Sequence, residues 1–130
     1  MDTNVWLRGA AEPATLPERI RRLLDARDGQ FGLSAISLWE AAKKHQIGKL
    51  HLKKDLGAWS REAVAMHIQL LPLTPEVVTE AVELPDFPNR DPADELIVAT
   101  ARIHKLTVLT TDTKLKSYRH ARIQYFTPIT

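Results

Sequence analysis

Four acidic side chains stand where an α/β fold would gather them, at predicted starts of helices or ends of strands. We call them the acidic quartet: Asp2, Glu40, Asp94 and Asp112. At one edge of a sheet, these carboxylates would form a strongly negative pocket, and like charges that close stay ionised only beside a counter-cation. Oxygen ligands suit Mg²⁺ or Mn²⁺. Because such a metal can activate water against a phosphodiester, the pattern points to hydrolysis of nucleic acid.

Each member of the quartet also has a purely structural explanation. Glu40 could be the third-position partner of a capping box that begins at Ser37, and Asp94 could favour the first turn of its helix. Asp112, in Thr-Thr-Asp-Thr, has the composition of a turn. Asp2 would ordinarily be a frayed terminal residue. The chemical interpretation therefore depends on all four carboxylates converging.

The stretch 89–112 predicts the elements that position two of these acids. Asp91 is a good N-cap and Pro92 suits the first position of a helix whose apolar face follows. The short apolar run 106–109 predicts a buried strand that ends just before Asp112. A carboxylate at the start of a helix and another after the next strand lie on the same side of an α/β sheet, where such folds bind ligands.

The rest of the chain alternates helical patterns with short apolar runs. Helices are predicted over 17–27, 37–46, 52–67 and 74–84, and strands over 31–36, 68–73 and 121–126. This alternation predicts a single α/β domain over 1–130 with a mostly parallel sheet. Tryptophan is mostly a core residue, and we expect all three tryptophans in the core: Trp6, Trp39 and Trp59.

Composition is that of an ordinary globular protein, with 44% hydrophobic and 26% charged residues among 130. The absence of a spanning apolar stretch or a secretory leader predicts a cytoplasmic protein without membrane contact. The absence of cysteine excludes thiolate catalysis and cysteine-ligated zinc. A net charge of +2 is too small to indicate nucleic acid by itself.

Basic residues follow two of the acids in the sequence. One group follows Glu40 and the other follows Asp112: Lys43, Lys44, Lys49, His51, Lys53 and Lys54, then Lys114, Lys116, Arg119, His120 and Arg122. Cations beside an acidic pocket would hold phosphates while the carboxylates hold a metal. From composition alone, a solvated surface is the favoured interpretation of both groups.

Four short motifs follow one another along nearly the whole chain: Asp2-Thr3-Asn4-Val5, Ser37-Leu38-Trp39-Glu40 with Gly48-Lys49-Leu50, Arg90-Asp91-Pro92-Ala93-Asp94, and Leu109-Thr110-Thr111-Asp112. In this order and spacing they resemble the PIN domain, and more closely the VapC-type toxins of bacterial toxin–antitoxin pairs. The resemblance implies a three-layer α/β/α sandwich around a five-stranded parallel sheet. It also implies a Mg²⁺- or Mn²⁺-dependent endoribonuclease acting on RNA, tRNA included, that forms a homodimer and binds a VapB-type antitoxin.

The resemblance assigns roles motif by motif. The acidic quartet becomes the catalytic and metal-binding set, and Asp91 looks like a helix cap rather than a primary ligand. The Thr110 hydroxyl would orient the last carboxylate or a metal-bound water, with Asn4 as a further supporting residue. Lys44 and Lys49 are then expected to bind RNA.

The start of the chain departs from the family pattern. Family members have several apolar residues before the first aspartate, and these form the central strand, whereas only Met1 precedes Asp2 here. We therefore expect a shortened first strand. A catalytically weak or inactive PIN-fold binding partner is the alternative function. A phosphotransferase with an aspartyl nucleophile is disfavoured, because Asp2-Thr3-Asn4 is not an Asp-x-Asp pair.

Overall fold

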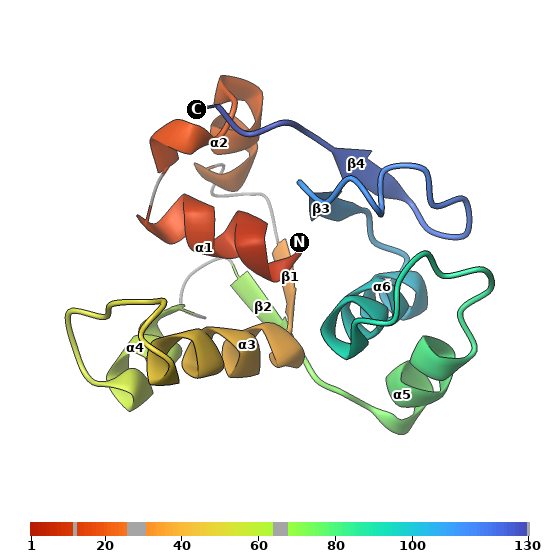
Figure 1. Cartoon of the computed structure of the whole chain (residues 1–130), viewed down its shortest axis with the longest axis horizontal. Helices are drawn as coiled ribbons and strands as arrows, with labels where there is room; N and C mark the ends of the chain where they lie inside the picture. The colour runs from red at the N-terminus through yellow and green to blue at the C-terminus, as the bar shows by residue number, and fades with distance from the viewer. Residues whose placement is uncertain (12, 26–30, 64–67, 130) are drawn as a thin grey trace.

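The computed structural model describes the chain apart from residues 12, 26–30, 64–67 and 130, and statements about contacts refer to the described residues. The helices are α1 (Thr3–Ala11), α2 (Glu18–Asp25), α3 (Ala35–Gln46), α4 (Leu56–Ala63), α5 (Pro75–Val82) and α6 (Pro92–His104), with a 3-10 turn η1 at Pro13–Thr15. The strands are β1 (Phe31–Ser34), β2 (Ile68–Leu71), β3 (Val108–Thr110) and β4 (Ile123–Tyr125). Figure 1 shows β1 and β2 near the centre among the helices and β3 and β4 toward the upper right, and this mixture of helices and parallel strands confirms the predicted α/β class.

The described strands form two parallel pairs, β1 with β2 and β3 with β4. The first two residues lie between the pairs. The Met1 amino group donates a hydrogen bond to Gly32 O (3.2 Å) and the Asp2 amide donates to Leu109 O (3.0 Å). A fully formed central strand would bond to both neighbours along its length, whereas Met1 and Asp2 contribute one bond to each side. Among the described residues, the strands therefore form two separate pairs rather than the single five-stranded sheet that the family resemblance implied.

A cavity of about 220 Å³ lies between the two strand pairs. Its lining includes Met1, Phe31, Leu71, Ile97 and Val108, which come from the chain start, both strand pairs and α6. Apolar side chains dominate this lining, so the space is suited to the side chains of an extended apolar segment. The interrupted sheet is therefore also an incompletely filled part of the core.

Helix α6 is the central helix of the fold, with contacts to α3, α5, β1 and β3. Its buried residue Ala99 packs against Val77 and Ala81 of α5. Thr74 caps α5 by accepting the Val77 amide (3.2 Å), and Pro75 takes the first helical position, as predicted. The same arrangement of cap and proline begins α6, so its N-terminus is fixed in position.

Several predicted boundaries are wrong. The sequence predicted no helix over 3–11, where α1 forms, and it began the next helix at Ser37. In the structure, Ser34 ends β1 in extended conformation and caps α3 by accepting the Ile36 amide (3.3 Å), so α3 begins two residues earlier. The third strand begins at Val108 because the Leu106 amide still bonds to Ala101 O (2.8 Å) and closes α6. The predicted helix 52–67 is α4, with 64–67 outside the described residues.

The prediction for the tryptophans is correct for Trp6 and wrong for Trp39. Trp6 is buried and packs against the partly buried Trp59, with ring centroids 5.4 Å apart. Trp39 is 56% exposed and lies beneath the Lys43 ammonium, 5.5 Å from its ring centroid. Its position in α3 turns it away from Ala41, which belongs to the core cluster of Trp6.

Candidate active site

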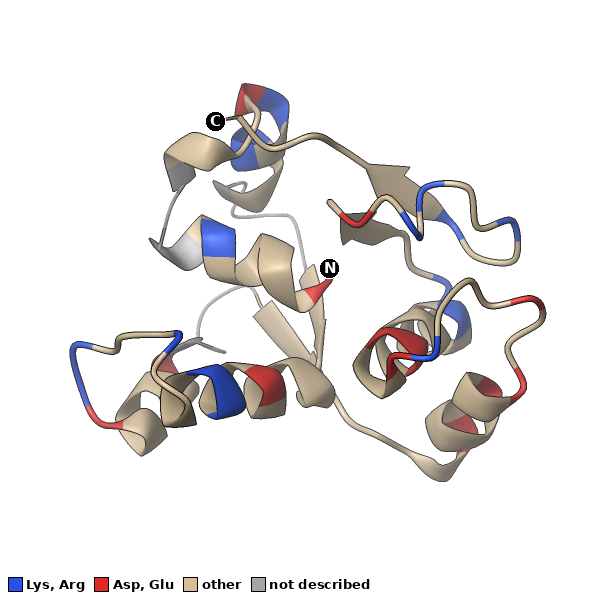
Figure 2. Cartoon of the chain, viewed as in Figure 1, with Lys and Arg blue, Asp and Glu red and all other residues tan. Residues whose placement is uncertain are grey.

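The acidic quartet is contributed by four separate elements. Asp2 precedes α1, Glu40 lies in α3, Asp94 lies in the first turn of α6, and Asp112 follows β3. Figure 2 shows acidic segments at the start of α1, within α3, at the start of α6 and after β3. Because parallel strands end at the same edge, the fold directs these segments toward one region, as the sequence analysis predicted.

Asp2 is a buried and well-held residue, which overturns the alternative that it is a frayed terminus. It is 6% exposed, and its Oδ1 accepts the Val5 amide (2.9 Å). Its Oδ2 accepts the Thr110 hydroxyl (2.5 Å), and the Thr110 oxygen in turn accepts the Asp112 amide (3.0 Å). Thr110 therefore links the Asp2 carboxylate to the backbone amide of Asp112 through a single hydroxyl group.

Glu40 is held by a residue that the sequence analysis did not single out. The Thr3 hydroxyl donates to Glu40 Oε1 and is also hydrogen-bonded to Ser37 Oγ (2.8 Å). Thr3 and Ser37 are both buried. The predicted capping box between Ser37 and Glu40 is therefore not formed. Ser34 caps α3 instead, and the Ser37 hydroxyl is hydrogen-bonded to Thr3 of α1. The position of Thr3 next to Asp2 was the only signal for this role.

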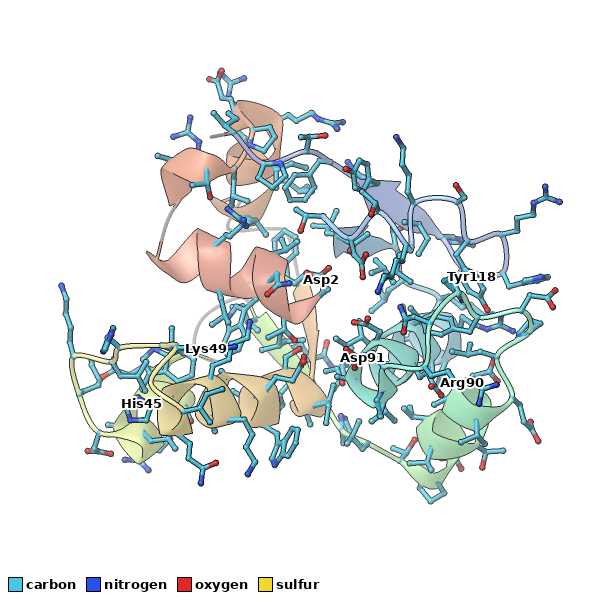
Figure 3. The ribbon with its side chains drawn as sticks, viewed as in Figure 1. Asp2, His45, Lys49, Arg90, Asp91 and Tyr118 are labelled. Atoms are coloured by element: carbon cyan, nitrogen blue, oxygen red, sulfur yellow. The ribbon has the colours of Figure 1, made fainter. Side chains whose placement is uncertain are left out.

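The N-terminus of α6 positions Asp94. Asp91 caps the helix by accepting the amides of Ala93 (2.9 Å) and Asp94 (3.4 Å), which confirms it as a cap. Asp94 Oδ2 accepts the Asn89 side-chain amide (3.3 Å), and Asn89 also orders the turn by accepting the Asp91 amide (2.8 Å). Asn89 is a second supporting residue that the sequence analysis did not identify. Asp91 is labelled in Figure 3 at this helix end.

The electrostatics of Asp94 show that the four carboxylates act on one another. The pKa of Asp94 is raised from 3.8 to about 7, first by burial and then by the charges of Asp91, Asp112, Glu40 and Asp2. Burial also raises the pKa of Asp2, against the bonds from Thr110 and Val5 that lower it. The negative charge of the quartet is therefore only partly compensated by the chain itself.

The quartet fits a divalent cation in chemistry but does not form a closed cage. Among the described residues, no three Asp, Glu, His or Cys side chains are grouped closely enough to hold one metal ion. Mg²⁺ usually binds through one or two carboxylates and keeps several waters. Carboxylate oxygens and the uncompensated charge around Asp94 suit an ion bound in that partly hydrated manner.

The chain matches the PIN domain over residues 1–121. It belongs to the PIN-domain family. A related PIN protein, Ribonuclease VapC22 of Mycobacterium tuberculosis, is 33% identical over 122 residues, covering 94% of this chain and 92% of the relative. The resemblance to VapC-type PIN toxins is therefore confirmed.

Two solved structures share this PIN fold. VapBC2 from Rickettsia felis, bound to a DNA fragment from its promoter, superposes with a TM-score of 0.69 at 16% identity, covering 95% of this chain and 94% of that one. A toxin–antitoxin complex from Klebsiella pneumoniae gives a TM-score of 0.65 at 17% identity, covering 95% and 92%. At these identities the likeness supports the fold alone.

The two lysines predicted to bind RNA lie on one side of this PIN domain. Lys44 in α3 is partly buried, and its ammonium donates to Asn4 Oδ1 (3.0 Å) two residues from Asp2. Lys49 is exposed after the turn at Gly48, whose φ is 80°, and its amide donates to Lys44 O (2.8 Å). Figure 3 shows Lys49 at the C-terminal end of α3. Asn4 thus connects the start of the chain to the nearer lysine.

No helix among the described residues is long and apolar enough to cross a membrane.

Proposed function

We propose that this PIN domain is a Mg²⁺- or Mn²⁺-dependent endoribonuclease and the toxin of a toxin–antitoxin pair. The observation that carries the proposal is the convergence on Asp94: the charges of Asp112, Glu40 and Asp2 each raise its pKa, which supports a position near Asp94 for all three carboxylates. The relative named Ribonuclease VapC22 supports hydrolysis of RNA as the activity. The whole chain, 1–130, is taken as one domain of this kind.

In this mechanism the carboxylates of the acidic quartet would hold a partly hydrated divalent cation, which would supply an activated water and neutralise charge on the phosphodiester. Thr110 fixes Asp2 and the backbone of Asp112, and Thr3 fixes Glu40. The carboxylates are thereby oriented before substrate arrives, so little ordering remains for the reaction itself. Asp94, whose pKa lies near 7, loses its proton most readily when a cation compensates the other three charges.

The proposed partners follow from the same family. The structural neighbour from Klebsiella pneumoniae is a toxin–antitoxin complex, and we assign this chain a VapB-type antitoxin and a homodimeric state. RNA, tRNA included, is the proposed substrate, with Lys44 and Lys49 holding phosphates beside the carboxylates. Asn4 supports this arrangement by fixing the Lys44 ammonium.

A catalytically weak or inactive binding partner is the second candidate. Two observations favour it: the sheet is interrupted where Met1 and Asp2 replace a strand, and no close group of three metal-binding side chains occurs among the described residues. In that case the protein would keep its antitoxin-binding surface without cleaving RNA.

RNA cleavage by the purified protein with Mn²⁺ separates the two candidates. The controls are EDTA, the Asp94→Asn variant, and Asp55→Asn as a matched exchange. Asp55 is exposed and caps the first turn of α4 through the Ala58 amide (2.9 Å), a role that asparagine also fills. Cleavage that EDTA and Asp94→Asn abolish, and Asp55→Asn preserves, establishes the nuclease. A folded protein that never cleaves is the inactive partner.

A further inference from the structure

Two adjoining hollows lie along the segment 113–122. One, of about 410 Å³, is lined by residues that include Lys114, Tyr118 and Asp86. The other, of about 420 Å³, is lined by residues that include Arg102, Lys105 and Arg122. Arg119 and His120 line both hollows, so the two adjoin at these residues, and together we call them the basic groove.

The basic groove begins beside the acidic quartet and leads away from it. At one end, the Lys114 amide donates to Asp112 Oδ1 (2.9 Å). At the other end, Lys105 caps the C-terminus of α6, while Asp94 lies in the first turn of the same helix. The 13 residues of α6 span about 20 Å. A nucleic-acid strand bound at the quartet could therefore follow the groove along α6, from the end near Asp94 to the end near Lys105.

The lining of the groove is strongly positive. It contains five lysine or arginine residues and one acidic residue, Asp86. Arg102 is neutralised by Glu80 (2.7 Å), and His120 lies 3.7 Å from the Asp86 carboxylate. The other four cations have no hydrogen bond or ion pair from their side chains to the described part of the chain: Lys105, Lys114, Arg119 and Arg122. Their charge is available to an anionic ligand.

The walls of the groove are held by polar and aromatic contacts. Arg102 Nη1 donates to His120 O (2.6 Å), and the Tyr118 hydroxyl donates to Pro85 O (2.7 Å). Tyr118 also packs edge-on against Phe87 and His120, at centroid distances of 5.3 and 5.7 Å. Figure 3 shows Tyr118 beside the loop that precedes α6. Because these backbones are already ordered, binding at the groove costs less conformational entropy.

We propose that the basic groove binds a single-stranded stretch of RNA that flanks the phosphodiester at the acidic quartet. The proposal rests on the proposed nuclease function and adds the path of the substrate. Unpaired cations that track a backbone, with an exposed ring such as that of His120 for stacking, match the general pattern of single-strand binding. RNA is favoured over an acidic protein segment because Lys114, at one end of the groove, is bonded to Asp112 of the acidic quartet, where the phosphodiester would bind.

The test measures RNA binding without cleavage. A fluorescent single-stranded RNA is titrated with the full chain in EDTA over a series of salt concentrations. The variant is Arg119→Gln with Arg122→Gln. The matched control, Arg19→Gln with Arg21→Gln, removes the same charge from exposed positions on α2, which Figure 1 shows on a different side of the molecule. Melting curves check that all proteins remain folded.

The groove variant should bind RNA less tightly and lower the slope of log affinity against log salt by about 1.4, because each single-strand phosphate contact contributes about 0.7. The α2 control should keep the wild-type slope. Equal losses in both double variants, or no RNA binding by the wild-type chain, would overturn the proposal. So would unchanged RNA binding in a groove variant that loses binding to polyglutamate, which would assign the groove to an acidic protein.

A separate cleavage assay distinguishes this proposal from the function on which it rests. If the groove variant binds and cleaves RNA as the wild type does, the proposed nuclease function is supported and RNA binding in the groove is refuted. If the wild type binds RNA through the groove yet never cleaves it with Mn²⁺, RNA binding in the groove is supported and the proposed nuclease function is refuted.

Discussion

At the scale of single residues, the site depends on hydroxyl groups as much as on carboxylates. Thr110 bonds to Asp2 and to the Asp112 backbone, and Thr3 bonds to Glu40 and Ser37. A carboxylate that repels its neighbours keeps one orientation only if donors hold it. These threonines therefore let a negative site exist in a defined geometry before a cation arrives.

Replacing Thr3 with valine should slow cleavage while the protein stays folded. Valine keeps the shape but removes the donor to Glu40, leaving the buried Ser37 hydroxyl without its partner, a loss of about 1–3 kcal/mol in stability. Single-turnover cleavage rates with saturating Mn²⁺ give the measurement. Thr3→Ser keeps the hydroxyl and should restore most of the rate. Equal rates in the valine and wild-type proteins would show that Glu40 does not need this bond.

Asp94 should make the metal-free protein less stable as pH rises. Its folded pKa of about 7 exceeds the ordinary value of 3.8, so the folded state holds more protons between these values. Stability must then fall as pH rises through that interval. In EDTA, Asp94→Asn should have a higher melting temperature than the wild type at about pH 8, and the difference should shrink at about pH 5. A pH-independent difference would contradict this linkage.

At the scale of elements, local signals predicted α5 and α6 well and the start of the chain poorly. Thr74-Pro75 and Asp91-Pro92 determine caps and first turns through adjacent residues alone, and both appear as expected. The cap at Ser34 could not be inferred from spacing, because Ser37 offered an equally good pattern and only tertiary contact with Thr3 removes it. The exposure of Trp39 likewise depends on which face of α3 meets the core.

The quartet illustrates the same limit. The sequence predicted that Asp94 lies in the first turn of its helix and that Asp112 follows a strand, but it placed Glu40 in the first turn of a helix that begins earlier, at Ala35. The influence of Asp2, Glu40 and Asp112 on Asp94 agrees with the predicted convergence. The sequence could not predict that Asn89 bonds to Asp94 or that Thr3 bonds to Glu40, because these bonds depend on side-chain directions rather than on spacing. The catalytic roles of the four carboxylates remain predictions.

An apolar extension before Met1 should stabilise the fold. Four to six residues such as valine and isoleucine, about the length of β1, would extend between the strand pairs, add ladder bonds to both and fill the cavity of about 220 Å³. Each added bond contributes about 1 kcal/mol, and the melting temperature should rise by roughly 4 °C per kcal/mol. An extension of equal length with alternating glycine and proline is the control, since proline cannot donate to a ladder. Equal melting temperatures would show that no strand enters.

At the scale of the whole molecule, cations lie on two sides of the acidic quartet. The net charge is only +2, yet the carboxylates of the quartet gather at one edge while Lys44 and Lys49 lie on one side and the basic groove on another. Figure 2 shows this distribution. A phosphate backbone can therefore approach the acidic site along cations, which reconciles a negative centre with a polyanionic substrate.

Reversing the charge of Lys44 and Lys49 tests whether RNA also contacts the protein on the side of the quartet away from the basic groove. Lys44→Glu with Lys49→Glu should weaken RNA binding and reduce its salt dependence, because two phosphate contacts are replaced by repulsion beside Asn4 and Asp2. Fluorescence anisotropy over a salt series measures both effects, with Arg19→Glu and Arg21→Glu as the matched reversal on α2. If both reversals lower affinity equally, these lysines act only through net charge. If the lysine pair flattens the slope and the α2 reversal does not, RNA contacts Lys44 and Lys49. Together with a reduced slope in the groove variant, this result would place the quartet between two phosphate-binding surfaces.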